Sequence, residues 1–318
     1  MGEFDLIRRC FERPVRRAAL GVGDDCALLA LAPDMQLAIS TDMLVEGRHF
    51  LSTVPPQRLG HKALAVNLSD LAACGARPLA FTLALSLPRA DEAFVAGLAE
   101  GLFALAAEHD IELVGGDTTA GPLNLCITVM GEVPAGQALL RSGARPGDEL
   151  WVSGQLGDAR LALEVFRGRL ALDAAAMEQV RAAMEQPQPR VQLGLALRGV
   201  ASAAIDLSDG LIGDLGHILQ RSGVGAQVEL DRLPHSAVLA AQPAALRQEC
   251  LLAGGDDYEL LFCAPAARHD AVLAAGQWAG VPVQRIGHIL DRPGLCVVNA
   301  AGQAVALQGL QAFDHFKS

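Results

Sequence analysis

Aromatic residues and long apolar runs are scarce in this sequence. Aromatic side chains make up 4% of its 318 residues, so no aromatic surface for stacking the bases of nucleic acid stands out. The formal net charge of −11 argues against sequence-independent binding to a nucleic-acid backbone. No uninterrupted apolar stretch is long enough to cross a bilayer. A phosphorylated small molecule remains possible as a ligand, because Mg²⁺ can neutralise both its phosphates and protein carboxylates.

The cysteine pattern gives no sign of a disulfide framework or a metal site. The seven cysteines are scattered, none forms C-x-x-C, and most lie in apolar runs, which predicts buried free thiols. No His/Cys pattern typical of zinc is present. Residues 1–11 lack the long apolar core of a secretory signal. We therefore expect a cytoplasmic protein.

Several familiar catalytic motifs are also missing. The sequence has no G-x-x-x-x-G-K-[ST] P-loop, no protein-kinase H-R-D with D-F-G, and no G-x-S-x-G elbow. His49, His61, His217 and His235 are isolated, and each taken alone predicts a structural or surface role. No arrangement of Ser, Cys or His indicates an activated covalent nucleophile.

What the chain does contain is a repeated pairing of acidic residues with glycines in apolar surroundings. The blocks are residues 21–29, 38–44, 65–76, 113–122, 204–216 and 252–262. Carboxylates are costly to bury unless they are paired or bound to a cation, and glycine lets the backbone approach a ligand. Oxygen ligands without His or Cys favour Mg²⁺ over zinc. Together these features predict a nucleotide phosphate site.

One acidic block lies on an expected helix. Asn67 and Asp70 follow helical spacing with Ala63, Val66 and Cys74, so they interrupt an otherwise apolar stripe. A satisfied buried polar pair is the alternative explanation. Because the other acidic blocks repeat the same chemistry, we favour metal binding.

A second block marks the end of an expected strand and the start of a helix. Helix capping by Ser208 or Asp209 is the alternative there, but it does not explain Asp206 at the strand end. A helix N-terminus also suits phosphate oxygens. The run 40–42 places three oxygen ligands in a row, and Asp117 follows two glycines. Asp24 and Asp25 are adjacent in a glycine turn, for which a solvated turn is the alternative.

The length exceeds one typical core and predicts two domains. In the first half we expect helices at 3–11, 57–74 and 91–109, strands at 26–32, 36–40, 81–87, 111–114 and 123–133, and a loop at 115–117. A boundary at 134–147 follows. In the second half we expect strands at 149–153, 203–207, 227–230, 260–263 and 295–298, and helices at 157–166, 173–185, 191–199, 208–221 and 268–279. This mixture lacks the strict βαβ alternation of a Rossmann fold.

The motifs taken in order carry a resemblance. The runs are GVGDDCALL, STDMLVEGRHF, KALAVNLSDLAACGARP, GGDTTAGP, RSGARPGD, AIDLSDGLIGDLGHI, GGDDYEL and FDHF. They closely resemble bacterial thiamine-monophosphate kinases, of the aminoimidazole-ribonucleotide synthetase superfamily, along nearly the whole chain. The resemblance implies a fold of two domains, the first α+β and the second α/β. The N-terminal domain, residues 1–138, is expected to bind ATP and Mg²⁺ and to form a dimer through its sheet. The C-terminal domain, residues 139–318, is expected to complete the active site.

The resemblance also implies roles for individual residues. The positions that match Mg²⁺ ligands are Asp25, Ser40, Thr41, Asp42, Asp70, Asp117, Asp206 and Asp209. The positions that match ATP contacts are Gly116, Asp117, Arg141 and Ser208. His49, Asp256 and Phe313 match contacts to thiamine monophosphate. Of these residues, Asp42, Asp70 and Asp117 are expected to hold metals on the triphosphate, and Arg141 to support the nucleotide.

The expected reaction is transfer of a phosphoryl group from ATP to thiamine monophosphate, which gives thiamine diphosphate and ADP. The substrate's ionised phosphate oxygen can attack in line without a covalent intermediate. One departure is Asp256, where the family usually has Glu in GGEDYEL. Another enzyme of the superfamily is the first alternative, but a reactive cysteine in an N-terminal glycine loop and a C-terminal cysteine motif are both missing. A non-enzymatic protein that binds divalent metal or thiamine phosphate is the second.

Overall fold

The computed structural model describes residues 3–23 and 25–310. The chain divides into two compact units. The N-terminal unit comprises Met1–Leu71 and Ala76–Gly136, and the C-terminal unit comprises Ala72–Gly75 and Gln137–Ser318. The expected division into domains 1–138 and 139–318, with its assignment of roles, stays a prediction.

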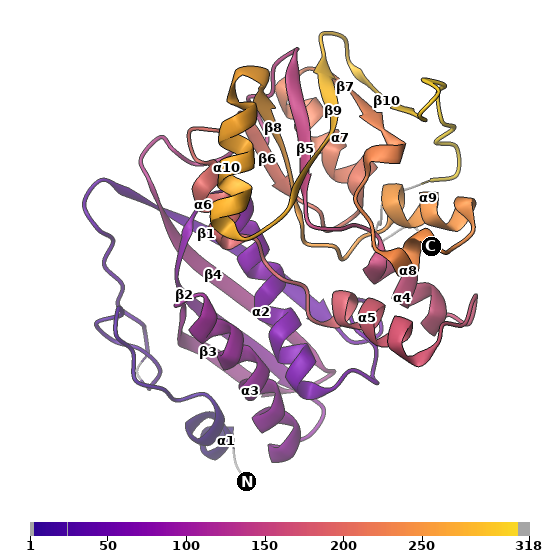
Figure 1. The fold of residues 1–318 in the computed structure, drawn as a ribbon. Helices are drawn as coiled ribbons and strands as arrows, with labels where there is room; N and C mark the ends of the chain where they lie inside the picture. Colours follow the sequence, from indigo (N-terminus) through magenta and orange to yellow (C-terminus); the bar gives the residue numbers. More distant parts are fainter. Residues whose placement is uncertain (1–2, 24, 311–318) are drawn as a thin grey trace. The chain divides into compact units, whose positions relative to one another are not determined.

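The N-terminal unit is built on a four-stranded sheet with the order β1-β4-β2-β3 (Figure 1). Its strands are β1 (Met35–Val45), β2 (Arg77–Leu87), β3 (Glu112–Ala120) and β4 (Asn124–Pro134). Its helices are α1 (Glu3–Cys10), α2 (Pro56–Ala73) and α3 (Glu92–Glu108). β4 pairs antiparallel with β1 and β2, whereas β2 and β3 are parallel. Asp91 caps α3 by accepting a hydrogen bond from the N–H of Phe94.

Helices α2 and α3 touch closely because glycines remove side chains from their contact. A Cβ added at Gly60 would lie 1.9 Å from the carbonyl oxygen of Leu98, and one at Gly101 would lie 1.8 Å from that of Gln57. The apolar side chains of β2 alternate, so Phe81 is buried while Ala84 is exposed. The sheet therefore has one buried face and one open face.

Two expectations about this unit were wrong. Residues 26–32 form no named strand; Leu28 makes one isolated bridge to Leu20. Residues 115–117 are not a loop, because β3 continues through them in parallel pairing with β2. The register shifts between Phe81 and Thr82, which accommodates the extra residue of β3 as a bulge. Local glycine content indicated a turn, but pairing with a distant strand prevailed.

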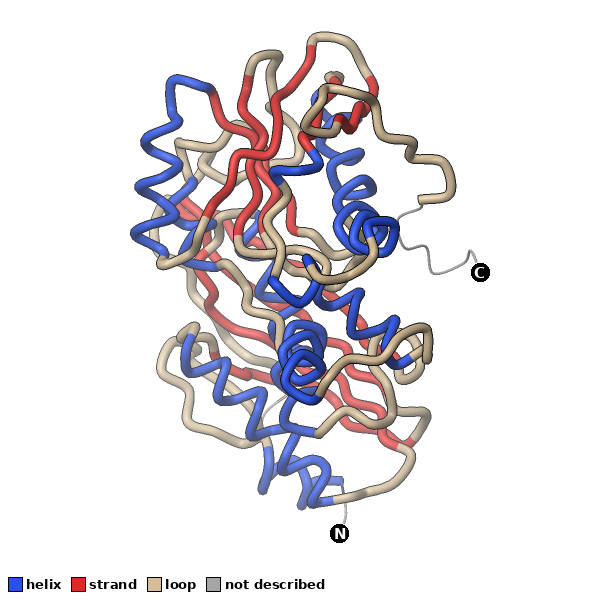
Figure 2. Tube along the Cα trace, turned by 45° about the vertical axis from the view of Figure 1, so that its right-hand side comes forward, coloured by secondary structure: helices blue, strands red, loops and turns tan. Residues whose placement is uncertain are grey.

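The C-terminal unit contains a six-stranded sheet with the order β10-β7-β9-β5-β8-β6. Its strands are β5 (Asp148–Ser153), β6 (Ala203–Asp206), β7 (Gly225–Glu229), β8 (Leu260–Pro265), β9 (Val283–Leu290) and β10 (Gly294–Val298). Its α-helices are α4 (Asp158–Phe166), α5 (Ala174–Glu185), α6 (Val191–Leu197), α7 (Leu211–Ser222), α8 (Ala237–Ala240), α9 (Ala244–Ala253) and α10 (His269–Ala279). Figure 2 distinguishes these strands and helices by colour.

The described pairs in this sheet are antiparallel except β10 with β7. Leu150, Leu215, Leu261 and Ile286 belong to its continuous buried core. Sequence patterns missed β9 and α9, and they placed the start of α7 at residue 208, three residues before Leu211. Within the described residues, every helix falls short of the length or hydropathy that a membrane span needs. The seven cysteines are free thiols; Cys10, Cys250 and Cys263 are buried, whereas Cys26 is exposed.

Candidate functional site

In the N-terminal unit, helix α2 brings two polar side chains to edge strand β1. Ser40 Oγ donates a 2.5 Å hydrogen bond to Asp70 Oδ2. The backbone N–H of Asp42 donates to Asn67 Oδ1 at 3.0 Å, and Asn67 Nδ2 donates to the carbonyl of Ala63 at 2.9 Å. Both polar atoms of the buried Asn67 amide thus have a backbone partner, so hydrogen bonding within the protein explains why an asparagine lies on this apolar face. Ser40, Asp42 and Asp70 are half-buried and form a group of oxygen atoms on one face.

This oxygen group suits Mg²⁺ better than a softer metal. Among the described residues, no three His, Cys, Asp or Glu side chains converge into a metal-ligating set. Mg²⁺ keeps several waters and is usually bound through one or two carboxylates together with substrate phosphates. Two carboxylates and a hydroxyl fit that requirement, so the group can hold the metal that the sequence predicts.

Other predicted ligands of the same unit lie elsewhere on the sheet. Residues that pair across two neighbouring strands point to the same face of a sheet. Asp117 pairs with Ala84 of β2, and Ala84 is exposed. Thr41 is exposed, and its hydroxyl lies 2.9 Å from that of Thr128. These side chains lie on the open face, whereas Ser40 and Asp42 lie on the face covered by α2. Asp25 is exposed in the N-terminal loop.

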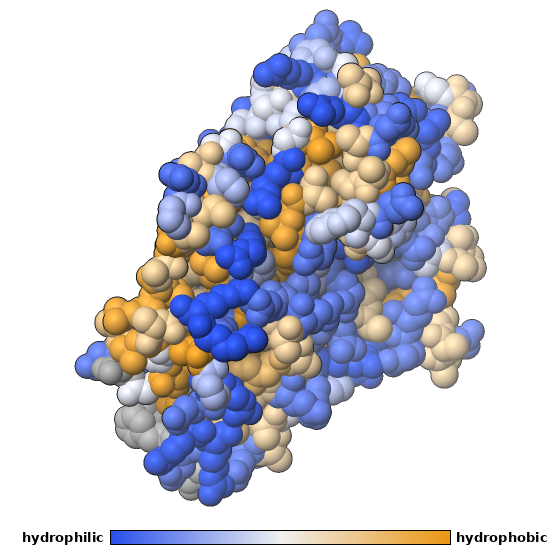
Figure 3. Space-filling view, turned by 60° about the vertical axis from the view of Figure 1, so that its left-hand side comes forward, coloured by the Kyte–Doolittle hydropathy of each residue, from blue (hydrophilic) through white to orange (hydrophobic). Residues whose placement is uncertain are grey.

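The open face also carries exposed apolar side chains. Leu37, Ile39 and Met43 alternate along β1 and are 44%, 60% and 54% exposed. We call these three residues the open-face patch. Figure 3 shows apolar surface gathered over the N-terminal unit on this side. Exposed apolar side chains gathered on one face are a feature of surfaces at which proteins associate.

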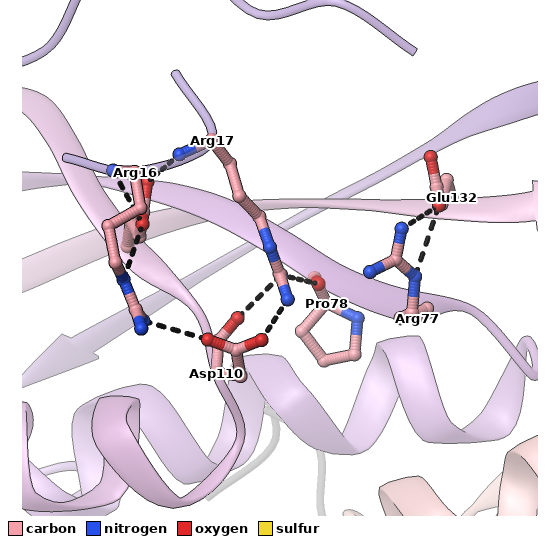
Figure 4. Close-up of polar contacts among 7 residues, drawn as sticks. Arg16, Arg17, Arg77, Pro78, Asp110 and Glu132 are labelled. Atoms are coloured by element: carbon pink, nitrogen blue, oxygen red, sulfur yellow. Dashed lines mark hydrogen bonds and ion pairs between the residues drawn. The ribbon is translucent and has the colours of Figure 1, made fainter. Parts of the chain in front are cut away.

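The segment that leads to Asp25 is anchored by a network of charges, shown in Figure 4. Glu112 of β3 accepts the backbone N–H groups of Arg16 and Arg17 at 2.9 and 3.1 Å. Arg17 pairs with the carboxylate of Asp110 and donates to the carbonyls of Asp110 and Pro78. Burial opposes ionisation of Glu112, but the backbone donors outweigh it, so its pKa lies below the ordinary value. The network fixes where the acidic loop begins.

His49 is held at the turn that follows β1. Its Nδ1 accepts the N–H of Val45 at 3.0 Å, so the neutral ring carries its proton on Nε2. The buried ammonium group of Lys62 donates to the carbonyl of His49 at 3.1 Å. His49 therefore has a fixed tautomer and orientation, which suits a residue that donates a hydrogen bond to a ligand.

In the C-terminal unit, Asp206 ends β6, and Ser208 and Asp209 precede α7. Capping by Ser208 or Asp209 is wrong, because the N-cap is Gly210 and no side chain caps it. The N–H groups of Asp209 and Gly210 instead donate to the carboxylate of Asp214, each at 3.1 Å. The backbone N–H groups at the N-terminus of α7 are therefore bonded to the carboxylate of Asp214, a residue of the same helix. Burial raises the pKa of Asp214 to about 7.

Asp214 was missed by sequence reasoning, although an acidic residue in the first turn of a helix is a recognised signal. The loop that carries Asp256 lies directly beside Ser208. The N–H of Asp256 donates to the carbonyl of Ser208 at 2.9 Å, and that of Tyr258 donates to the carbonyl of Leu207 at 2.8 Å. The structure thus brings Asp206, Ser208, Asp209 and Asp256 together.

Arg141, the predicted nucleotide contact, is exposed. The preceding residue, Leu140, accepts the N–H of Ala204 at 2.9 Å through its carbonyl, which places Arg141 beside the start of β6. Phe313 lies outside the described residues.

Two family models match most of the chain. Residues 23–133 match the N-terminal domain of AIR synthase related proteins, and residues 145–298 match the C-terminal domain. The chain is 47% identical to the thiamine-monophosphate kinase of Escherichia coli K12, over 99% of this chain and 98% of the relative. It is 32% identical to that of Bacillus subtilis 168, over the full length of both.

Solved structures agree with this likeness. The thiamine-monophosphate kinase of Stenotrophomonas maltophilia K279a superposes with a TM-score of 0.86 at 46% identity, covering 95% of this chain and 96% of that one. AaThiL complexed with AMPPCP and TMP superposes with a TM-score of 0.78 at 29% identity, covering 90% and 89%. The hydrogenase maturation protein HypE in complex with ATP shares the fold, with a TM-score of 0.80 at 22% identity, covering 98% of this chain and 95% of that one.

Proposed function

Because the chain belongs to the thiamine-monophosphate kinase family, it is an ATP-dependent phosphotransferase, and we propose that it transfers the γ-phosphoryl group directly to thiamine monophosphate. The observation that carries this proposal is the full-length likeness to kinases of which one is complexed with AMPPCP and TMP. The products are thiamine diphosphate and ADP. The ionised phosphate oxygen of the substrate is the nucleophile, and no protein residue forms a covalent bond to phosphorus.

The proposed metal ligands form two groups. Ser40, Asp42 and Asp70 supply one, and Asp206 with Asp209 supplies the other. Thr41, Asp117 and Asp25 are proposed to bind Mg²⁺ as well, as the resemblance implies, but apart from the first group, because Thr41 and Asp117 lie on the open face of the sheet and Asp25 lies in the N-terminal loop. When bound, Mg²⁺ ions would neutralise the charge on the triphosphate and on the transferred group.

The remaining roles concern orientation of the two substrates. We assign Gly116, Arg141 and Ser208 to ATP, where the exposed guanidinium of Arg141 can pair with phosphate oxygens. His49 can donate from Nε2 to the substrate phosphate, because its Nδ1 is already engaged. Asp256 places a negative charge near the cationic thiazolium ring. Alignment of donor and acceptor then accounts for much of the catalysis.

Direct transfer predicts how a label moves. Incubation with γ-labelled ATP alone should leave no acid- or base-stable label on the protein, because the proposed nucleophile is the ionised phosphate oxygen of the substrate and not a protein side chain. Addition of thiamine monophosphate should move the label into thiamine diphosphate, with release of ADP in equal amount. Thiamine itself, which lacks the acceptor phosphate, is the matched control.

Two outcomes would contradict this proposal in different ways. A labelled residue that passes its phosphoryl group to thiamine monophosphate would show a covalent route. Binding of thiamine monophosphate without any release of ADP would favour the alternative of a binding protein.

We also propose a homodimer that forms through the open-face patch. β1 is an edge strand of its sheet, and a two-fold contact would bury the same apolar residues of both copies. Leu37, Ile39 and Met43 share one face of β1, and each is at least 44% exposed, so they form a group of exposed apolar side chains and not an isolated one. Burial of the apolar surface of these three side chains would therefore stabilise the dimer.

The Ile39→Asp substitution is expected to convert the dimer into a monomer. A buried unpaired carboxylate at the contact would cost several kcal/mol, of the order known for isolated charges. Sedimentation equilibrium measures the change. Leu273→Asp is the matched control, because Leu273 is 45% exposed on α10 and should leave the mass unchanged. A wild-type chain that sediments as a monomer at micromolar concentration would contradict the proposal.

A further inference from the structure

The loop between α9 and β8 carries Asp256 in an unusual backbone conformation. Asp256 has φ of +68° and Tyr258 has φ of +49°, although neither is glycine. Left-handed backbone is unfavourable for such residues and persists where the surroundings impose it. The loop's backbone bonds to Ser208 and Leu207 hold one side. The other side must be held by contacts further along the loop.

Those contacts come from Glu259, which is 4% exposed. Its carboxylate pairs with both ends of the Arg190 guanidinium; Arg190 Nε lies 2.7 Å from Glu259 Oε2, and Nη2 contacts Oε1. Ser153 Oγ donates to Glu259 Oε2 at 2.5 Å and accepts the N–H of Leu260 at 2.8 Å. A buried carboxylate that makes a bidentate ion pair with an arginine and accepts a hydrogen bond from a hydroxyl is fixed in one position.

Gly154 provides the space for this carboxylate. A Cβ at Gly154 would lie 1.8 Å from Glu259 Oε1 and 2.2 Å from its Cδ. Tyr258, which precedes Glu259, donates from its hydroxyl to Asp256 Oδ1 at 3.1 Å. If Glu259 were displaced, the adjacent Tyr258 would move with it, and the Asp256 carboxylate that is bonded to the Tyr258 hydroxyl would move as well.

We propose that Glu259, Arg190 and Ser153 form a positioning network that sets where the Asp256 carboxylate meets the thiamine end of the substrate. The network itself does not touch the substrate. This inference rests on the proposed function, because it assumes that Asp256 contacts thiamine monophosphate. It gives the buried ion pair at the base of that loop a role other than stability, because well-packed apolar residues often replace such a pair without loss of stability.

Gly154→Ala tests the network without changing any charge. The added methyl group displaces the Glu259 carboxylate, so the KM for thiamine monophosphate should rise by about tenfold to a hundredfold, as expected for misplacement by about 1 Å. The KM for ATP should stay within about twofold. Gly168→Ala is the matched control, because Gly168 also has positive φ, +72° against +57° for Gly154, and its Cβ would meet nothing within 4 Å.

Combination with Asp256→Ala separates positioning from a general effect on folding. If the network acts through Asp256, Gly154→Ala should raise the KM for thiamine monophosphate little further in the Asp256→Ala background. If Gly154→Ala does not fold by circular dichroism, Glu259→Gln is measured in the same two backgrounds with the same expected split, because it keeps the side-chain volume.

The outcomes distinguish the two hypotheses. Wild-type activity with an unchanged KM in Gly154→Ala, an equal rise of both KM values, or additive effects of Gly154→Ala and Asp256→Ala would each overturn the positioning network alone. A wild-type chain that does not phosphorylate thiamine monophosphate would overturn the proposed function and, with it, the premise of the network.

Discussion

The Asp70→Asn variant is expected to turn over at least about a hundredfold more slowly than wild type at limiting Mg²⁺, in the range found when a single electrostatic contact of a transition state is removed. Asparagine keeps the size of the side chain and an oxygen that can accept the hydroxyl of Ser40. The fold should therefore survive. What is lost is the charge that binds the cation, so the Mg²⁺ concentration for half-maximal rate should rise.

Glu108→Gln is the matched control for this experiment. It removes one negative charge from the exposed end of α3, so it reproduces the change in net charge without touching the oxygen group of β1 and α2. Near-normal turnover of Asp70→Asn at limiting Mg²⁺ would remove Asp70 from the metal site. A large fall in melting temperature with an unchanged Mg²⁺ dependence would make Asp70 a structural residue.

The helix that carries Asp70 was predictable, whereas its polar contacts were not. Apolar spacing predicted a helix at 57–74, and α2 spans Pro56–Ala73. The same spacing placed Asn67 and Asp70 on one face, but periodicity cannot say what faces a side chain. The structure separates the two, because Asn67 bonds to the backbone of Asp42 and Asp70 meets a hydroxyl of β1. That distinction depends on pairing between segments distant in sequence.

Residues that support the site were the hardest to find. Asp214 and Glu259 were not singled out by motif, yet each is nearly fully buried and holds a loop that carries a predicted site residue. Asp257, which is half-buried, also makes a supporting contact: its carboxyl accepts the N–H of Gly157 at 2.9 Å, and burial raises its pKa well above the ordinary value. Acidic residues at such positions look alike in a sequence. Burial and hydrogen-bond geometry tell a supporting acid from a binding one.

The Gly116→Ala variant is expected to lose both stability and activity, although the family resemblance implies only an ATP contact for Gly116. Its φ is +152°, and a Cβ there would lie 1.9 Å from the carbonyl oxygen of Leu83 on the paired strand. Backbone cannot move aside as a flexible side chain can, so β3 must shift from β2. Strain and overpacking together should cost roughly 2–5 kcal/mol of the free energy of unfolding.

Gly115→Ala is the neighbouring control, because a Cβ at Gly115 has its nearest contact 3.8 Å away, at Thr82 Cγ2. It should keep the melting temperature and most of the activity, whereas Gly116→Ala should melt roughly 10 °C lower. The two variants change the glycine pair by the same single methyl group, so a difference between them reports the contact between strands. If Gly116→Ala raises the KM for ATP and leaves the melting temperature unchanged, the glycine serves nucleotide binding and the close approach of β3 to β2 is unimportant. If the KM for ATP rises and the melting temperature also falls, we infer that the close contact between β3 and β2 positions Asp117 for nucleotide binding.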